Sequence, residues 1–113
     1  ILPVMRQHNS GQIINVASMA ATTGVARASV YAATKWAVVG LTESLKQEVR
    51  DTNIKVASIL PGSVRTDFFQ KAGVEYNDKR ILEPQDVAQA IYNIAEQPAS
   101  ADVDKVMLRP ALR

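Results

Sequence analysis

The sequence predicts an open α/β fold whose strands are parallel. Two segments, GQIINVAS and IKVASILPG, are short, rich in Ile and Val and without polar alternation, which is typical of strands covered on both faces. Between them lies a stretch of about twenty residues that favour helix. A strand, a helix and a second strand in this order pair in parallel through a right-handed crossover.

The first strand is expected at residues 12–17, directly after Gly11. Residues 19–28 are small and polar, and they predict a loop. Ser29 precedes an alanine-rich segment, and the helix that begins there is expected to run to about Arg50.

This helix is predicted to bury two faces. One is an apolar stripe: Val38, Leu41, Leu45 and Val49. The other is a stripe of small side chains: Ala33, Ala37, Gly40 and Ser44. The small stripe would let a second helix pack closely, for instance one from another subunit. Alternatively, the whole helix would be buried inside a thick domain.

The next strand, IKVASILPG, is expected to stop at Pro61 and Gly62. Residues 63–82 are predicted to be irregular. The segment EPQDVAQAIYNIAEQP has proline at its first helical position and acid in its first turn, which predicts a helix ended by Pro98. KVMLRP supplies a last strand.

Length and composition exclude several classes of protein. The 113 residues with 47% apolar content fit one domain, and the net charge of +2 is dispersed, so we expect no nucleic-acid partner. The sequence has no cysteine, which excludes disulfides and agrees with a cytoplasmic location. No apolar span of about twenty residues is visible, so no membrane partner is expected.

Three polar side chains are predicted to meet at one edge of this sheet. Ser18 follows the first strand, and Tyr31 and Lys35 lie four residues apart on one face of the helix that returns from that edge. A nearby ammonium stabilises the phenolate form of tyrosine, so Lys35 would prepare Tyr31 to exchange a proton with a carbonyl or an alcohol. Ser18 would hold the same oxygen by hydrogen bonding. This group suits hydride transfer, in which a cofactor carries the reducing equivalent.

A structural interpretation of the same residues stays open. Tyrosine and lysine at this spacing also occur by chance. Tyr31 would then be a half-buried side chain, Lys35 a solvated lysine whose stem covers apolar surface, and Ser18 a partner of main-chain groups at a strand end.

Five segments resemble the classical short-chain dehydrogenases/reductases: GQIINVAS, the thirteen-residue interval from Ser18 to Tyr31, YAATKWAVVGLTESLKQEV, IKVASILPGSVRTDF and EPQDVAQAI. The match covers nearly the whole chain in the family's order and spacing. It implies a doubly wound, Rossmann-like parallel sheet, of which this chain is the C-terminal portion. It also implies an NAD(P)-dependent oxidoreductase that interconverts a secondary alcohol and a carbonyl by hydride transfer.

The resemblance implies roles for individual residues. Tyr31 would be the catalytic acid/base, Lys35 would assist it and bind the ribose of NAD or NADP, and Ser18 would orient the substrate. Further cofactor contacts would come from four residues: Pro61, Gly62, Val64 and Thr66. A substrate loop would contribute three aromatic side chains, or these would form a local staple instead: Phe68, Phe69 and Tyr76.

The glycines are too far apart to form the family's phosphate-binding turn: Gly11, Gly24, Gly40, Gly62 and Gly73. We therefore expect residues 1–113 to be a single partial domain, the C-terminal half of such an enzyme, and to be inactive alone. Its first strand would then leave an unpaired edge. The intact enzyme is expected to be a homodimer or homotetramer that acts on a small-molecule alcohol or carbonyl.

Other functions were weighed against this one. A catalytically silent Rossmann-type module for nucleotide sensing or interaction would be expected to have lost Ser18, Tyr31 or Lys35, and all three are present. A hydrolase with a Ser-His-Asp triad lacks its GxSxG turn, and His8 is the only histidine. A metal site lacks both cysteine and a second histidine.

Overall fold

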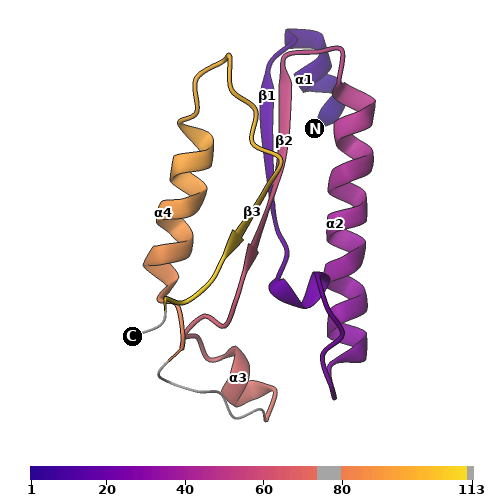
Figure 1. Ribbon diagram of the computed structural model, residues 1–113. Coiled ribbons are helices and arrows are strands. Elements are labelled where there is room, and N and C mark those ends of the chain that lie inside the picture. The colour runs from indigo at the N-terminus through magenta and orange to yellow at the C-terminus, as the bar shows by residue number, and fades with distance from the viewer. Residues whose placement is uncertain (74–79, 112–113) are drawn as a thin grey trace.

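Parallel strands form a three-stranded sheet, and one long helix covers each of its faces (Figure 1). The computed structural model describes residues 1–73 and 80–111. The strands lie side by side in chain order: β1 (Gly11–Val16), β2 (Ile54–Pro61) and β3 (Lys105–Leu108). The helices on the two faces are α2 (Ser29–Val49) and α4 (Pro84–Ala95). The predicted parallel α/β arrangement is confirmed.

Alternate side chains of each strand divide between the two faces of the sheet. Asn15 of β1 lies opposite Ser58 of β2, and Ser58 lies opposite Lys105 of β3, so these three side chains share the α2 face. The intervening side chains face α4, where Ala57 and Ile59 pack in one cluster. Among the described residues β1 pairs only with β2, as expected for a partial sheet.

β2 holds the core because both of its faces are covered. Val56, Ile59 and Leu60 are each at most 1% exposed. Full burial of such a side chain stabilises the fold by roughly 1.5–3 kcal/mol. The short helix α1 (Leu2–His8) extends this core with partly buried apolar side chains near the start of β2.

The buried face of α2 differs from the predicted stripe. Val38, Leu45 and Val49 do pack in the core clusters, but Leu41 is 57% exposed. Neighbouring residues lie about 100° apart around a helix. Thr42, one position on, is 0% exposed and occupies the buried face instead. Apolar character alone predicts that Leu41 is buried, whereas the structure buries the hydroxyl group of Thr42.

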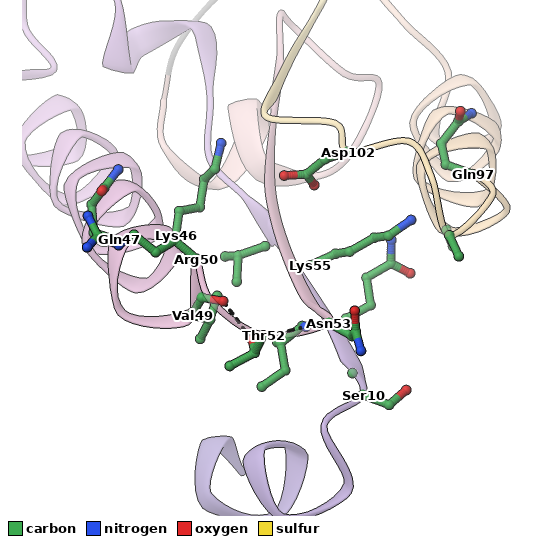
Figure 2. A pocket seen from close by; sticks show the side chains of 16 residues that line it. Ser10, Lys46, Gln47, Val49, Arg50, Thr52, Asn53, Lys55, Gln97 and Asp102 are labelled. Atoms are coloured by element: carbon green, nitrogen blue, oxygen red, sulfur yellow. Dashed lines mark hydrogen bonds between the residues drawn. The ribbon is translucent and has the colours of Figure 1, made fainter.

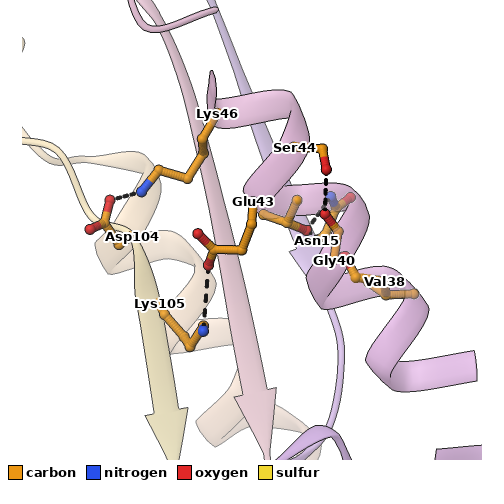
Figure 3. Close-up of polar contacts among 9 residues, drawn as sticks. Asn15, Val38, Gly40, Glu43, Ser44, Lys46, Asp104 and Lys105 are labelled. Atoms are coloured by element: carbon orange, nitrogen blue, oxygen red, sulfur yellow. Dashed lines mark hydrogen bonds and ion pairs between the residues drawn. The ribbon is translucent and has the colours of Figure 1, made fainter. Parts of the chain in front are cut away.

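That hydroxyl is hydrogen-bonded across the interface between helix and sheet (Figure 3). Asn15 Nδ2 donates to Thr42 Oγ1 at 2.9 Å, and Thr42 Oγ1 donates to Val38 O at 2.7 Å. Two ion pairs join α2 to the start of β3: Lys46 with Asp104 and Glu43 with Lys105. These contacts fix the position of α2 along the strands.

The segment between β1 and α2 is more ordered than the loop predicted for residues 19–28. It contains a 3-10 helix, η1 (Met19–Ala21), which buries Ala20 and Ala21. Their small side chains allow the segment to lie close to α2 and β2, because Ala21 packs in one cluster with Val39 and Leu60. Most of residues 22–28 is exposed.

Residues 63–82 are not wholly irregular. They include a short helix, α3 (Phe68–Lys71), and the two ends of the segment are hydrogen-bonded to each other. Arg65 N donates to Leu82 O, and Leu82 N donates to Ser63 O, both at 2.8 Å. This isolated bridge closes the base of a surface loop, a long-range pairing that local composition does not reveal.

Candidate active site

The carboxyl-terminal ends of the strands meet at one edge of the sheet, where η1, the first turns of α2 and α3 also gather (Figure 1). Ser18 lies two residues beyond β1, at the amino-terminal cap of η1. Its Oγ accepts a hydrogen bond from Ala20 N at 3.1 Å. Because a hydroxyl donates as well as accepts, its O–H remains able to bind a ligand oxygen.

Tyr31 lies in the first turn of α2 and is half-buried. Its ring packs against Phe68 of α3, with 5.4 Å between the ring centroids. Lys35, one turn later, places Nζ 5.7 Å from the Tyr31 ring centroid and donates to Val16 O at 3.4 Å. The ammonium is therefore held between the aromatic ring and the end of β1.

The segment after β2 offers main-chain groups at the same edge. Pro61 is buried, and Gly62 N donates to Leu108 O at 2.8 Å. The bridge between Val64 and Leu82 uses the main-chain groups of Leu82, which bond to Ser63 and Arg65. The N–H and C=O of Val64 have no hydrogen bond to any described residue. A donor and an acceptor placed together in this way can bind an amide group.

The predicted substrate residues are only partly described. Phe68 is 50% exposed, and its main-chain N donates to Thr66 Oγ1 at 3.4 Å. The backbone of Phe69 belongs to α3, but its side chain lies outside the described part of the structure. Tyr76 lies outside the described residues.

A cavity of about 990 Å³ brings most of the predicted site residues together. Its lining includes six of them: Ser18, Tyr31, Gly62, Val64, Thr66 and Phe68. Lys35 and Pro61 do not line it. A phenol, an aliphatic hydroxyl and free main-chain groups thus border one space, with the aromatic ring of Phe68 as a wall.

A second hollow, of about 790 Å³, lies at the opposite edge of the sheet (Figure 2). Its described lining contains none of the predicted site residues. The cations there already have partners within the chain. Lys55 Nζ donates to the carbonyl oxygens of Pro98 and Ala101, both at 2.6 Å, and Lys46 pairs with Asp104. Most of the predicted site residues therefore gather at the 990 Å³ cavity and not at this second hollow.

Two charged residues among the described lining of this cavity are not in the predicted site: Arg27 and Arg109. The sequence does contain a signal for Arg109. In the predicted strand KVMLRP, the alternation of side chains places Arg109 on the same face of the sheet as Lys105. Arg27 carries no comparable signal, because its position depends on the path of the segment before α2.

The described residues contain neither a cluster of metal ligands nor a membrane-spanning helix. In residues 1–73 and 80–111, no group of three or more His, Asp or Glu side chains is placed to hold a metal ion. No helix in that part of the chain has the length and apolar character needed to cross a bilayer.

Comparison with known proteins gives the family. Residues 1–77 match the family model for short chain dehydrogenases. The chain belongs to the short chain dehydrogenase family. An uncharacterized oxidoreductase of Staphylococcus aureus (strain USA300) is 38% identical over 109 residues, and the alignment covers 96% of this chain and 46% of that relative. A relative of the same description from Staphylococcus epidermidis is 37% identical with the same coverage.

Solved structures of this family share the fold. Serine dehydrogenase complexed with NADP+ gives a TM-score of 0.85 at 28% identity, over 96% of this chain and 48% of that one. A betaketoacyl-[ACP] reductase from Bacteroides thetaiotaomicron gives 0.75 at 30% identity, over 95% and 44%. The short chain dehydrogenase chain described here therefore spans less than half the length of the relatives it matches.

Proposed function

We propose that residues 1–113 form the C-terminal half, as a single partial domain, of an NAD(P)-dependent oxidoreductase that interconverts a secondary alcohol and a carbonyl. One observation carries the proposal: Ser18 and Tyr31 border the same cavity, and the ammonium of Lys35 lies 5.7 Å from the Tyr31 ring centroid. Family membership and the oxidoreductase relatives support it.

Tyr31 is the proposed acid/base. In alcohol oxidation its phenolate accepts the hydroxyl proton as a hydride leaves the carbon, and in carbonyl reduction its O–H returns that proton to the oxygen. Lys35 is the neighbouring cation in this proposal, with Nζ 5.7 Å from the Tyr31 ring centroid. The hydroxyl of Ser18 donates a hydrogen bond to the same substrate oxygen, where charge develops during the reaction.

The residues at this edge fit a nicotinamide cofactor. The unpaired N–H and C=O of Val64 match a carboxamide, which presents both an acceptor and donors. Lys35 would bind the ribose hydroxyls, while Pro61, Gly62 and Thr66 would border the ring. When bound, NAD or NADP supplies or accepts the hydride. Serine dehydrogenase, a structural relative, is known complexed with NADP+.

The decisive test replaces Tyr31 by phenylalanine in the complete enzyme. Tyr31→Phe removes one hydroxyl and keeps the ring that packs on Phe68. We expect kcat to fall by about 10²–10⁴-fold, the usual contribution of general acid–base catalysis. Cofactor oxidation or reduction followed by absorbance measures turnover, and cofactor fluorescence measures binding, which should persist.

Tyr92→Phe is the matched control, because Tyr92 is exposed on α4, on the opposite face of the sheet from α2. It should keep wild-type turnover. Turnover of Tyr31→Phe within a few-fold of wild type would remove Tyr31 from proton transfer. A wild-type enzyme that binds the cofactor but reduces or oxidises nothing in a broad panel would favour the catalytically silent module.

The intact enzyme is further proposed to be a homodimer or homotetramer joined through α2. The predicted small stripe, Ala33, Ala37, Gly40 and Ser44, is exposed along its whole length. Apart from the adjacent residues and the backbone of α2 itself, no described atom would lie within 4 Å of a Cβ added at Gly40. Glycine inside a helix costs about 1 kcal/mol relative to alanine. No packing within the described chain requires this glycine, whereas close approach of a partner helix would.

A further inference from the structure

We propose that the substrate of this site carries a carboxylate, which Arg109 binds with the help of Arg27. This inference rests on the proposed oxidoreductase function and names its substrate class. The site would then recognise two groups of one small molecule. One is the hydroxyl or carbonyl group that reacts at Tyr31, and the other is the carboxylate that Arg109 and Arg27 bind.

Strand alternation places Arg109 on the catalytic side of the sheet. Lys105 of β3 forms an ion pair with Glu43 of α2, while Val106 and Leu108 pack in the cluster on the α4 face. Odd-numbered positions of β3 thus face α2. Arg109, the next position in this alternation, lines the same cavity as Tyr31 and Ser18.

The charge of the cavity is one-sided. The described residues of its lining include two guanidinium groups and no carboxylate. Neither Arg27 nor Arg109 forms a hydrogen bond or ion pair with another described residue, unlike Arg65, which is paired with Glu83 at 2.8 Å. A guanidinium presents a planar fork of donors that matches a carboxylate in bidentate geometry.

The backbone at Arg27 is a second, independent observation. Its φ is +62°, in the left-handed region that residues other than glycine, asparagine and aspartate rarely adopt. Gly24 lies only three positions earlier, so the segment does contain a residue suited to this conformation. A long cationic residue held in a strained conformation at a cavity wall is the kind of outlier that accompanies ligand binding.

A phosphate group of the cofactor could accept hydrogen bonds from the same two arginines, so a substrate carboxylate must be distinguished from a cofactor phosphate. Arg109 adjoins Leu108, whose carbonyl accepts from Gly62 N at 2.8 Å. This position is beside the segment proposed to meet the nicotinamide, and it favours the substrate as the source of the anion.

The test uses steady-state kinetics of the complete enzyme on matched pairs of substrates. Each pair is a hydroxy acid and its primary amide, namely lactate and lactamide, 3-hydroxybutyrate and 3-hydroxybutyramide, and 4-hydroxypentanoate and its amide. Acid and amide are close in size and differ in charge. The three chain lengths also report the spacing between the two recognition groups.

Wild-type enzyme should prefer the acid in at least one pair, measured as the acid-to-amide ratio of kcat/KM. Arg109→Gln should lower that ratio about 10–100-fold, because it removes charge-assisted hydrogen bonds. Arg109→Lys should recover part of it, since charge returns without the bidentate fork. Arg50→Gln, at the opposite edge of the sheet, should keep the wild-type ratio.

Three results would overturn the proposal. The first is that wild-type enzyme turns over substrates without preferring the acid in any pair. The second is that Arg109→Gln leaves the acid-to-amide ratio of kcat/KM unchanged. The third is that Arg109→Gln raises only the KM of NAD(P), which would assign the arginines to the cofactor. Each of these leaves the proposed oxidoreductase standing. Failure of the proposed oxidoreductase function would give a different result. Wild-type enzyme would then turn over no hydroxy acid, no amide and no uncharged secondary alcohol.

Discussion

At the scale of single residues, Ser18 has both a structural and a proposed chemical role. Its oxygen caps η1 by accepting from Ala20 N, and its hydroxyl also borders the cavity with Tyr31. The cap positions the hydroxyl, because the same hydrogen bond that begins η1 restricts the rotation of the side chain. A substitution here therefore affects stability and turnover together, and the two effects need separate measurements.

We predict that Ser18→Ala lowers kcat by about 10²-fold, the usual loss on removal of one hydrogen-bond donor to a developing oxyanion. Loss of the cap should also lower the free energy of unfolding by about 1 kcal/mol. Ser18→Thr keeps a hydroxyl and should recover most of the turnover. Steady-state kinetics and urea unfolding of the same preparations check both effects.

Thr52→Ala is the control for stability alone. Thr52 Oγ1 donates to Val49 O and accepts from Ile54 N, at the edge of the sheet away from the cavity. Its loss should destabilise the fold while kcat stays at the wild-type value. If Ser18→Ala behaves like Thr52→Ala, with reduced stability and normal turnover, Ser18 has only the capping role.

At the scale of elements, α2 is the part of the molecule that sets the geometry of the site. It carries Tyr31 and Lys35 in its first turns, and its middle is hydrogen-bonded to β1 through Thr42 and Asn15 (Figure 3). Ser18 follows β1 by two residues. The bond between Asn15 and Thr42 therefore joins the two elements that bring the hydroxyl and the phenol together.

We predict that Asn15 and Thr42 are energetically coupled. Thr42→Val should lower the free energy of unfolding by about 1–3 kcal/mol, because it leaves the Asn15 amide without its partner. Asn15→Leu should cost less once Thr42 is already valine. A double-mutant cycle from urea unfolding of the complete enzyme should give a coupling of about 0.5–1.5 kcal/mol.

An exposed bond of the same type provides the comparison. Gln89 Nε2 donates to Asn93 Oδ1 at 2.9 Å on the surface of α4. A cycle at this pair should give only about 0.2–0.5 kcal/mol, as for other pairs on a helix surface. Equal coupling at both pairs, or additive effects at Asn15 and Thr42, would contradict the role given to the bond between β1 and α2.

The elements also mark the limit of what the sequence predicts. The three strands and two long helices follow from β-branched runs, the proline at the start of α4 and the periodicity of each segment, all of which are local. Leu41 is predicted to be buried, but Thr42 is buried in its place, because the buried face depends on strands that are distant in sequence. The presence of Arg109 in the same cavity lining as Tyr31 likewise depends on the alternation of β3 relative to α2.

At the scale of the whole molecule, the described residues leave one edge of β1 and the outer face of α2 without a partner. β1 is an outer strand whose free edge exposes main-chain groups, and the outer face of α2 exposes Val30, Trp36 and Leu41 beside the small stripe. Apolar side chains and an open strand edge both favour association. The proposed N-terminal half and a second subunit would cover them.

We predict that Ala37→Arg reduces the assembly of the complete enzyme. The long cation would occupy the narrow gap between helices and bring like charges together across a two-fold axis. Light scattering or sedimentation should show a smaller mass, while circular dichroism should keep its wild-type shape. Ser100→Arg, in the exposed turn before β3, should leave the mass unchanged. A wild-type mass for Ala37→Arg would place the subunit interface elsewhere.

The loop from residue 63 to residue 82 has a closed base, made by the hydrogen bonds between Ser63, Arg65 and Leu82 and by the ion pair of Arg65 with Glu83. Because both ends are tied to each other, the residues between them can be lengthened, shortened or exchanged at little entropic cost and without shifting β2 or α4. Under the proposed function, selection acting on that segment would change which metabolite is bound, while Tyr31 and Lys35 on α2 would keep their positions.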